Sequence, residues 1–562
     1  MAVAAAAVTV SALAFGGWSA AKAGAFPSPV TVHEQEPATV SGRNDTPGTN
    51  QRISGFGTAA GAAGEARVQG VLAGPTSPTM LPAAREDDGS QSSAADTGLK
   101  PGRSARTTGT IGDGPHASAG DKTGDFDFYV VRGATMGQVL SVYVDTPDSE
   151  LRPTVRFWMD GEPEGVASNG NGSYLITTDL HTDGDFYFTV GAQGSEQADP
   201  NDSGSGNGAT SEGSYTATFS LDAGDTDVYA IDLAAGDVLS GSVSGSAARL
   251  QIFDRAKKLA VGAMADTLSS WFPKDSPLLR GGNAAVNHIA ARAGRYYVAV
   301  SSGKGEYDVR LNVNRPGPES KRATQIIFVD LDGASLDPAI FHDSQVGGVR
   351  KLSPLAAFIS RWGITGEAQQ GALVEQIITS LTENLQGDFA GTGSKVTILN
   401  SRDHRDPFGQ PHVSRVVIGG IQAELGRDGT GSAQSIDPGN FAMAETALIL
   451  LDTMSAPPGE MSLNTHLGPT SDRVRFVGTA IANLASHEVG HLLGAFHAFG
   501  AGGKPNLMMP GTESSAIYGV GADNIGGTAD DVDLDFEVAP FGYDTWFTGV
   551  EDCRARIRWA LS

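Results

Sequence analysis

The stretch ASHEVGHLLGAFH, residues 485–497, decides the fold of the C-terminal part of the chain. It holds three of the chain's eleven histidines, namely His487, His491 and His497. The residues before Gly494 contain few helix breakers, so they predict a helix. In a helix, positions four apart lie about 40° apart around the axis, which places the first two histidines on one face, one turn apart. Two imidazoles so placed can bind one zinc ion.

The third histidine needs a change of chain direction. A helix continued to His497 would carry that side chain about 120° away from the ligand face. Glycine tolerates the left-handed conformation, so Gly494 is expected to end the helix and fold the chain back toward the ion. Three histidines leave a fourth position open for water, which is the catalytic arrangement of zinc. Glu488 lies beside the first ligand, where it can contact a metal-bound water instead of the metal.

This spacing of three histidines, a glutamate and a glycine resembles the zinc signature of the metzincin metallopeptidases. NLMMPG, residues 506–511, supplies the methionine turn that the family carries downstream, with Met508 as the matching residue. The resemblance, closest to matrixin-like families, implies that residues 323–562 form an α/β (α+β) catalytic domain in which this methionine is a hydrophobic floor under the histidines. Ala498 follows the third ligand and is typical of no subfamily. Pro510 stands where astacin-like and serralysin-like enzymes have a tyrosine ligand, so no such ligand is expected.

The same segment has the alternating pattern of an α/β domain. IIFVDL, within residues 323–333, is a continuous apolar run typical of a buried central strand. Residues 371–385 place five aliphatic side chains on one face of an amphipathic helix. Further strands are predicted at 395–400, 414–420 and 446–452.

The implied activity is that of a secreted zinc-dependent metalloendopeptidase. Glu488 would take a proton from a zinc-bound water and pass it to the leaving amine, with a protein or peptide as substrate. Two alternatives remain open at this point. The chain could be an extracellular adhesin or binding protein with a vestigial peptidase domain, or a zinc amidase that acts on cell-wall material.

A second metal is considered in the acidic loop 521–536. Oxygen ligands on a flexible turn suit calcium, although the spacing is not that of an EF-hand. The alternative is a solvated acidic loop. The candidate calcium ligands are Asp523, Asp530, Asp531, Asp533 and Asp535.

Before the catalytic segment, the chain contains an internal repeat. TGDFDFYVVRGATMGQVLSVYV, from Thr123, matches AGDTDVYAIDLAAGDVLSGSVS, from Ala223, and both alternate apolar and polar residues as half-buried strands do. We therefore expect two all-β sandwiches, at 121–222 and 223–315, followed by a linker at 316–322.

These repeats resemble the bacterial pre-peptidase C-terminal domain, on the D-x-D-x-Y start, the G-x-V-L-S strand and the closing G-x-Y strands. The resemblance implies attachment to a cell surface or extracellular matrix, or substrate binding, rather than catalysis. The aspartates of the two D-x-D-x-Y starts are expected to be solvated strand edges rather than metal ligands. They are Asp125, Asp127, Asp225 and Asp227.

The N-terminal quarter of the chain is expected to contribute no folded domain. Residues 1–24 resemble a secretory signal peptide, because a small apolar run precedes an A-x-A site, although no Lys or Arg precedes that run. An alternative is a disordered Ala-rich tail. Residues 25–120 are rich in Gly, Ala, Ser, Thr and Pro, so they are predicted to be a disordered linker or prosegment.

Charge and composition exclude some classes of function. The chain of 562 residues has a formal net charge of −25, which argues against binding nucleic acid, whose phosphates require a basic surface. Its single cysteine allows no intrachain disulfide. No second apolar stretch is long enough to span a bilayer, so no stable membrane span is expected after removal of the signal.

Overall fold

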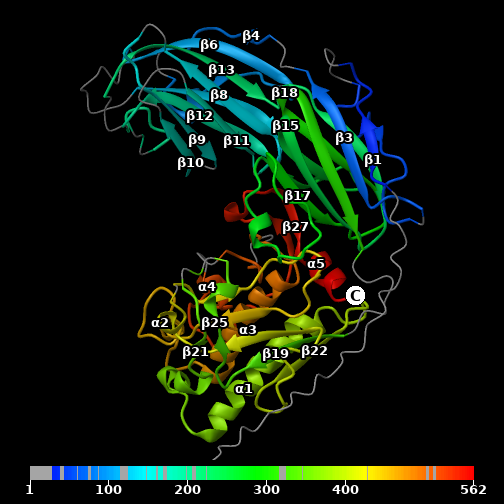
Figure 1. Cartoon of the computed structure of the whole chain (residues 1–562). Helices are drawn as coiled ribbons and strands as arrows, with labels where there is room; N and C mark the ends of the chain where they lie inside the picture. The colour runs from blue at the N-terminus through cyan, green and yellow to red at the C-terminus, as the bar shows by residue number, and fades with distance from the viewer. Residues whose placement is uncertain are drawn as a thin grey trace, which may run out of the picture.

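The chain is mostly β-sheet, arranged in several sheets with few helices (Figure 1). The predicted signal peptide (1–24) and linker (316–322) lie outside the residues that the structure describes. This computed structural model describes residues 28–562 except 38–42, 60, 74–76, 86–87, 114–124, 147–148, 160–161, 169–173, 181, 196, 198, 206–209, 223, 316–323, 343, 345, 427, 501–504 and 511–513.

The first sandwich consists of two five-stranded sheets, with strand orders β10-β9-β12-β7-β5 and β11-β8-β13-β6-β4. Its core combines aliphatic and aromatic side chains, and the rings of Phe188 and Phe219 meet edge to face with their centroids 4.9 Å apart. The strands are β4 (Thr79–Met80), β5 (Ala95–Asp96), β6 (Arg103–Ile111), β7 (Phe126–Ala134), β8 (Val139–Asp145), β9 (Pro153–Met159), β10 (Glu162–Ser168), β11 (Tyr174–Asp179), β12 (Gly184–Ala192) and β13 (Gly213–Leu221).

The second sandwich is built around two long strands, β15 and β18, which pair with each other along most of their length. β14 and β3 pair with β18, β1 extends the sheet beyond β3, and β17 and β16 pair with β15. The strands are β1 (Val30–His33), β2 (Gln51–Arg52), β3 (Glu65–Leu72), β14 (Asp227–Leu233), β15 (Val238–Phe253), β16 (Leu259–Ala263), β17 (Ala284–Ile289) and β18 (Gly294–Asn314).

The prediction that residues 25–120 are disordered is wrong for the part of this range that the structure describes. β1, β2 and β3 complete the second sandwich, and β4, β5 and β6 complete the first. The predicted sandwich boundaries at 121 and 223 are therefore too late, since each sandwich takes strands from the N-terminal region. β3 adds Val68 and Leu72 to the core of the second sandwich, whereas β6 buries mainly small or polar side chains such as Ala105 and Thr107 and pairs along its whole length with β13.

The C-terminal module has a five-stranded sheet in the order β22-β19-β23-β25-β24. The first four strands are parallel, and the edge strand β24 is antiparallel to β25. The bounds are β19 (Gln325–Asp330), β22 (Val396–Asn400), β23 (Val413–Ile418), β24 (Gly431–Ala433) and β25 (Thr446–Ile449), with the small elements β20 (Ser335–Leu336), β21 (Arg350–Lys351), α2 (Gln422–Leu425) and α4 (Ser514–Ile517).

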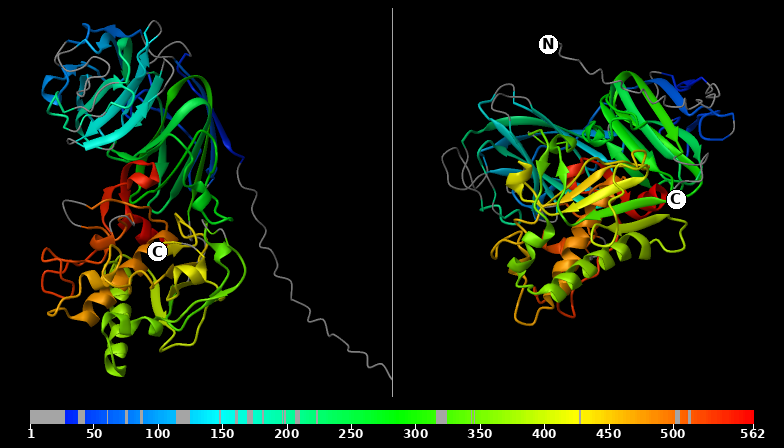
Figure 2. Two further views of the ribbon diagram at one scale, coloured as in Figure 1. Left: turned by 90° about the vertical axis from the view of Figure 1, so that its left-hand side faces the viewer. Right: turned by 60° about the horizontal axis from the view of Figure 1, so that its bottom comes forward.

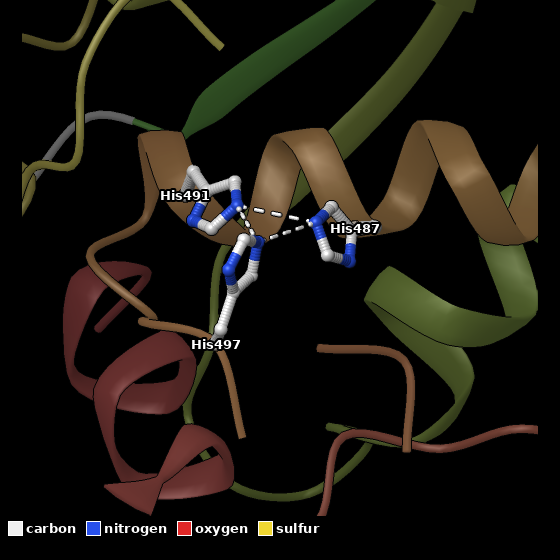
Figure 3. A group of neighbouring side chains, drawn as sticks. All are labelled: His487, His491 and His497. Carbon is white, nitrogen blue, oxygen red and sulfur yellow. Dashed lines mark hydrogen bonds between the residues drawn. The ribbon is translucent and has the colours of Figure 1, made fainter. Parts of the chain in front are cut away.

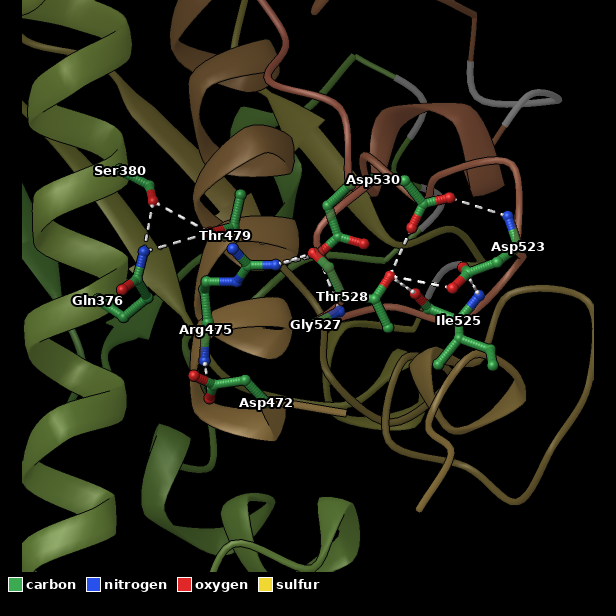
Figure 4. Close-up of polar contacts among 11 residues, drawn as sticks. Gln376, Ser380, Asp472, Arg475, Thr479, Asp523, Ile525, Gly527, Thr528 and Asp530 are labelled. Atoms are coloured by element: carbon green, nitrogen blue, oxygen red, sulfur yellow. Dashed lines mark hydrogen bonds and ion pairs between the residues drawn. The ribbon is translucent and has the colours of Figure 1, made fainter. Parts of the chain in front are cut away.

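Two long helices pack on this sheet, close to the predicted positions. They are α1 (Glu367–Thr382) and α3 (Arg473–Leu492), and they lie against each other, with Gln376 Nε2 donating to Thr479 Oγ1 at 3.2 Å (Figure 4). Nearly every residue of α3 from Phe476 onward is buried. The helix is thus enclosed between α1 and the sheet, which fixes the direction of its side chains.

The last part of the chain joins the C-terminal module to the second sandwich. β27 (Thr548–Asp552) pairs with both β26 (Val538–Pro540) and the sandwich strand β16, and α5 (Cys553–Ala560) follows. In Figure 2 this red segment lies between the green sandwich and the yellow-to-orange module. In the described part of the chain, no helix has both the length and the apolar character needed to cross a bilayer.

Candidate metal centre

Three imidazole rings converge at the C-terminal end of α3 (Figure 3). The Nε2 atoms of His487, His491 and His497 are mutually 3.2 Å apart. Zinc–nitrogen bonds of about 2.0–2.1 Å at tetrahedral angles require nitrogen atoms about 3.3 Å apart. The three nitrogen atoms therefore have the spacing that a tetrahedral ion demands.

The other ring nitrogen of each histidine fixes the tautomer. Each Nδ1 faces an oxygen that can only accept a hydrogen bond, so each Nδ1 must carry the proton. The pairs are His487 Nδ1 with the Leu507 carbonyl (2.7 Å), His491 Nδ1 with the Ala495 carbonyl (2.9 Å) and His497 Nδ1 with Asp544 Oδ2 (2.5 Å). All three Nε2 atoms then present lone pairs to one another, and this arrangement could hold a cation at its centre.

The protonation of the rings agrees with this assignment. Burial, reinforced by the neighbouring His497, lowers the pKa of His487 to about 3. Burial also lowers the pKa of His491 well below its usual value. Both rings are therefore neutral at physiological pH, which is the state that ligates a metal. The residues present fit a three-histidine metal site.

The third ligand is placed by the turn that the sequence predicts. α3 ends at Leu492, and Gly494 has a φ of +92°, a conformation that L side chains rarely adopt. A β-carbon there would also press against the main chain of Pro438. The glycine is needed on both counts, and it allows His497 to approach the other two rings from outside the helix.

Met508, the residue assigned to the methionine turn, packs against α3 at Gly490, between the two helical histidines. It is fully buried, and its main-chain carbonyl accepts a hydrogen bond from the Ala498 amide at 2.8 Å. A β-carbon on Gly490 would lie 2.5 Å from its Sδ atom and 3.0 Å from the ring of Phe536. The glycine between the two helical histidines therefore lets the methionine approach the helix closely.

Glu488 faces the same cavity as the histidines and is 6% exposed. Its carboxylate lies against the edge strand β24, where a β-carbon on Gly431 would overlap its Oε1 atom. Gly431 is thus required for the carboxylate to occupy this position. Sequence reasoning missed this residue because nothing local distinguishes Gly431 from the chain's many other glycines.

The three rings and Glu488 open into a cavity of about 500 Å³. One part of its wall comes from α3 and the segment after the methionine turn, including Leu484, Ile517 and Tyr518. Another part comes from β24 and the chain after it. Leu268 and Trp271, which belong to the second sandwich, also line the cavity. This volume suits a peptide segment or a drug-sized molecule.

The structure does not bring the five predicted calcium ligands together. Asp530 Oδ2 accepts from the Asp523 amide within a tight turn, and Thr528 bridges the two side chains (Figure 4). Asp531 forms an ion pair with Arg475 at 3.1 Å. Asp533 is exposed. Asp535 lies instead with Glu383 and Asp388, near the end of α1, and burial raises the pKa of Asp388 to about 8.

The two sandwiches repeat one polar network, which supports the internal repeat. In the second, the Tyr307 hydroxyl donates to Asp227 Oδ2 at 2.7 Å and lies 2.5 Å from the Tyr229 hydroxyl. In the first, Tyr215 donates to Asp127 and lies 2.6 Å from Tyr129. The prediction of solvated strand edges is wrong for three of the four aspartates, since Asp127, Asp225 and Asp227 are buried. The N-terminal region supplies partners for two of them: Asn44 donates to Asp227, and the Ala73 amide donates to Asp225.

The second sandwich adds further carboxylates to this network. We call Glu34, Glu36, Asp45, Asp225 and Asp227 the sandwich carboxylate cluster, because their oxygen atoms group within 4.8 Å of one another in two overlapping sets of three. One oxygen of each glutamate accepts main-chain amides, from Val71 for Glu34 and from Arg43 and Asn44 for Glu36. The other oxygen, Oε1 in both cases, is buried and has no hydrogen-bond partner among the described residues.

Comparisons with known proteins add little to this geometry. No protein-family model matches the chain, and no curated protein matches it. Among solved structures, the chain is similar to PliG, a periplasmic inhibitor of g-type lysozyme, from Aeromonas hydrophila (15% identity, 25% of this chain and 96% of that one) and from Salmonella Typhimurium (17%, 23% and 99%). It is also similar to CorA, a surface-associated copper-binding protein of Methylomicrobium album BG8 (13%, 26% and 100%). The TM-score is 0.14 in each case, so these likenesses carry no argument about fold or function.

Proposed function

We propose that this chain is a secreted zinc-dependent endopeptidase with a metzincin-type catalytic module. The observation that carries the proposal is the convergence of three Nε2 lone pairs beside a buried glutamate, in a cavity bordered by an edge strand. An all-imidazole ligand set suits zinc, and three protein ligands leave a position for catalysis. Export is inferred from the first 24 residues, which resemble a signal peptide.

Zinc, when bound, supplies Lewis-acid polarisation of the scissile carbonyl and of the attacking water. The chain supplies the remaining functions. Glu488 accepts the proton of the attacking water and delivers it to the leaving amine. Asp544 orients the imidazole of His497 by accepting its Nδ1 proton. β24 is the edge of its sheet and lines the cavity, so an extended substrate can add to it as a further strand.

The direct test compares the full-length protein with Glu488→Gln, both loaded with zinc, on casein and on a peptide library. We expect cleavage to fall by about 10²–10⁴-fold in the variant while the bound zinc stays equimolar. Zinc-loaded wild-type protein that cuts no peptide would contradict the proposal. Cleavage of cell-wall amides would then favour an amidase, and retention on matrix or cells without any cleavage would favour a binding protein.

Calcium is proposed as a second resident cation, in the sandwich carboxylate cluster and not in the loop 521–536. Burial raises the pKa of Asp225 to about 7 and that of Asp227 to about 8, which reflects the cost of several buried charges in one place. Asn44 Oδ1 is also buried without a hydrogen-bond partner among the described residues. Oxygen ligands alone, partly unsatisfied and strongly anionic, fit a hard divalent cation.

Calorimetric titration with Ca²⁺ of chelator-treated protein tests this site. We expect saturable binding that Glu36→Gln weakens at least tenfold. Glu306→Gln removes the same charge from an exposed position of the same sandwich and serves as the matched control. Equal binding by the two variants would refute the assignment.

A further inference from the structure

The cavity at the histidines has a wall that does not belong to the C-terminal module. Leu268 and Trp271 lie in the segment between β16 and β17 of the second sandwich, more than two hundred residues before the first histidine of the site. Both side chains are partly buried and pack against the sandwich core. The sandwich therefore contributes directly to the surface that a substrate would meet.

Hydrogen bonds and ring contacts hold this segment against the metal centre. The Trp271 carbonyl accepts a hydrogen bond from the Ile436 amide at 2.8 Å, and the Asp437 amide donates in turn to the His491 carbonyl at 3.0 Å. The ring of Trp271 lies 4.5 Å from that of His342. The indole is thus positioned by the chain that leads directly to a metal-binding histidine.

The second sandwich and the C-terminal module share a buried interface. Phe496, which precedes the third histidine, belongs to the hydrophobic core of the second sandwich together with Phe541 and Phe547. Beside it, the buried Arg556 pairs with Glu551 at 2.6 Å and donates to Asn287 Oδ1, on a sandwich strand, at 2.8 Å. The strand pairing of β16 with β27 adds main-chain hydrogen bonds. An interface of this kind fixes the relative positions of its parts.

Two of the cavity's lining residues are tied to different parts of α3. Leu484 lies about one helical turn before His487. The segment that carries Trp271 is joined through Ile436 and Asp437 to His491, near the C-terminus of the helix. A peptide lying along β24 with its scissile bond at the histidines would therefore place residues from opposite sides of that bond against Leu484 and against Trp271.

We propose that Trp271 and Leu268 form a selectivity wall, through which the second sandwich makes the site prefer peptides with a large apolar side chain on one side of the scissile bond. This proposal rests on the proposed peptidase function and specifies its substrate class. An indole and a leucine present apolar surface that a Phe or Leu side chain covers well and an Ala side chain covers poorly. The difference in apolar contact between a Phe or Leu side chain and an Ala side chain corresponds to about 10–200-fold in kcat/KM.

The experiment uses the zinc-loaded full-length protein and a library of blocked hexapeptides varied on each side of the cleaved bond. We expect Trp271→Ala to reduce kcat/KM for peptides with Phe or Leu at one position by about 10–100-fold, and to leave peptides with Ala there unchanged. Leu268→Ala should act in the same direction, and Trp271→Phe should keep most of the preference. Leu484→Ala should instead change the preference on the other side of the bond.

Trp546→Ala is the matched control, since this tryptophan is 70% exposed and does not line the cavity. An unchanged cleavage profile in Trp271→Ala, with wild-type activity intact, would overturn the selectivity wall and leave the peptidase proposal standing. Binding separates the two proposals further. In the Glu488→Gln background, calorimetry with the Phe and Ala hexapeptides measures the preference without catalysis. If Trp271→Ala leaves the affinity for the Phe hexapeptide unchanged, the selectivity wall is refuted.

Discussion

Asp544 Oδ2 accepts the Nδ1 proton of His497 at 2.5 Å, whereas the other two histidines of the site donate to main-chain carbonyls. Although burial opposes ionisation of Asp544, the hydrogen bond that it accepts from His497 holds the pKa of Asp544 below the usual value. A carboxylate partner orients the ring and makes its Nε2 a stronger ligand.

We therefore expect Asp544→Asn to weaken zinc binding by about 10–100-fold, measured by competition with a chromophoric chelator. Glu537→Gln removes one charge from the same C-terminal segment without touching a histidine, and its zinc affinity should match the wild type. If both variants bind zinc as the wild type does, the hydrogen bond to Asp544 has no role in holding the ion.

Gly431 is expected to be as sensitive to substitution as a residue of the reaction itself. The methyl group of Gly431→Ala would overlap the carboxylate of Glu488 and displace it from the cavity. Cleavage should fall by about 10²-fold or more, because a displaced general base loses most of its contribution, while zinc content stays unchanged. Gly371→Ala, at an exposed helix position with open space around it, should leave cleavage at the wild-type rate.

The local parts of the site could be read from the sequence, and the parts that depend on tertiary contacts could not. His487, His491 and the turn at Gly494 follow from helix geometry and from the conformational freedom of glycine. Asp544 and Trp271 reach the site from other elements, and no spacing rule links them to the histidines. Their roles appear only when the chain is folded.

The N-terminal strands were missed for a related reason. β6 reads RSARTTGTI, in which only Ala105 and Ile111 are apolar and buried, so its composition is that of a disordered segment. Its pairing with β13 satisfies the backbone and places small side chains against a core supplied by the repeats. Asn44, also from the N-terminal region, donates to the buried Asp227, and no pattern local to that aspartate indicates this contact.

The sandwich carboxylate cluster predicts how stability depends on pH. Asp225 and Asp227 have raised folded-state pKa values of about 7 and about 8, so the folded state binds their protons more tightly than the unfolded state does. Without divalent cations, stability should therefore fall as the pH rises from about 4 to about 8. Calcium at about 100 times its Kd should restore about 2.7 kcal/mol at pH 8.

Chemical denaturation at several pH values, with EGTA or with calcium, measures this effect. The free energy of unfolding with calcium should exceed that with EGTA most above pH 7. Near pH 4 the two values should be similar, because protonated carboxylates no longer bind the cation. Glu36→Gln should remove most of the calcium effect. A calcium effect that is the same at pH 4 and pH 8 would count against binding at this cluster.

The close approach of Gly490 and Met508 predicts a non-additive pair of mutations. Gly490→Ala gains about 1 kcal/mol of helix propensity, but its methyl group lies 2.5 Å from Met508 Sδ, and overpacking of this kind costs about 1–3 kcal/mol. The single mutant should therefore be less stable than the wild type or close to it. Met508→Ala alone should cost about 2–5 kcal/mol, because it leaves a cavity under the helix.

In the double mutant the added methyl group no longer meets the sulfur and instead fills part of the cavity. We expect its loss of stability to be smaller than the sum of the two single losses by about 0.5–3 kcal/mol, measured by denaturant unfolding of the zinc-loaded proteins. Gly371→Ala combined with Met508→Ala should be additive, since that glycine lies on α1, away from the methionine. Additivity in both pairs would mean that Met508 does not press on the helix that carries the histidines.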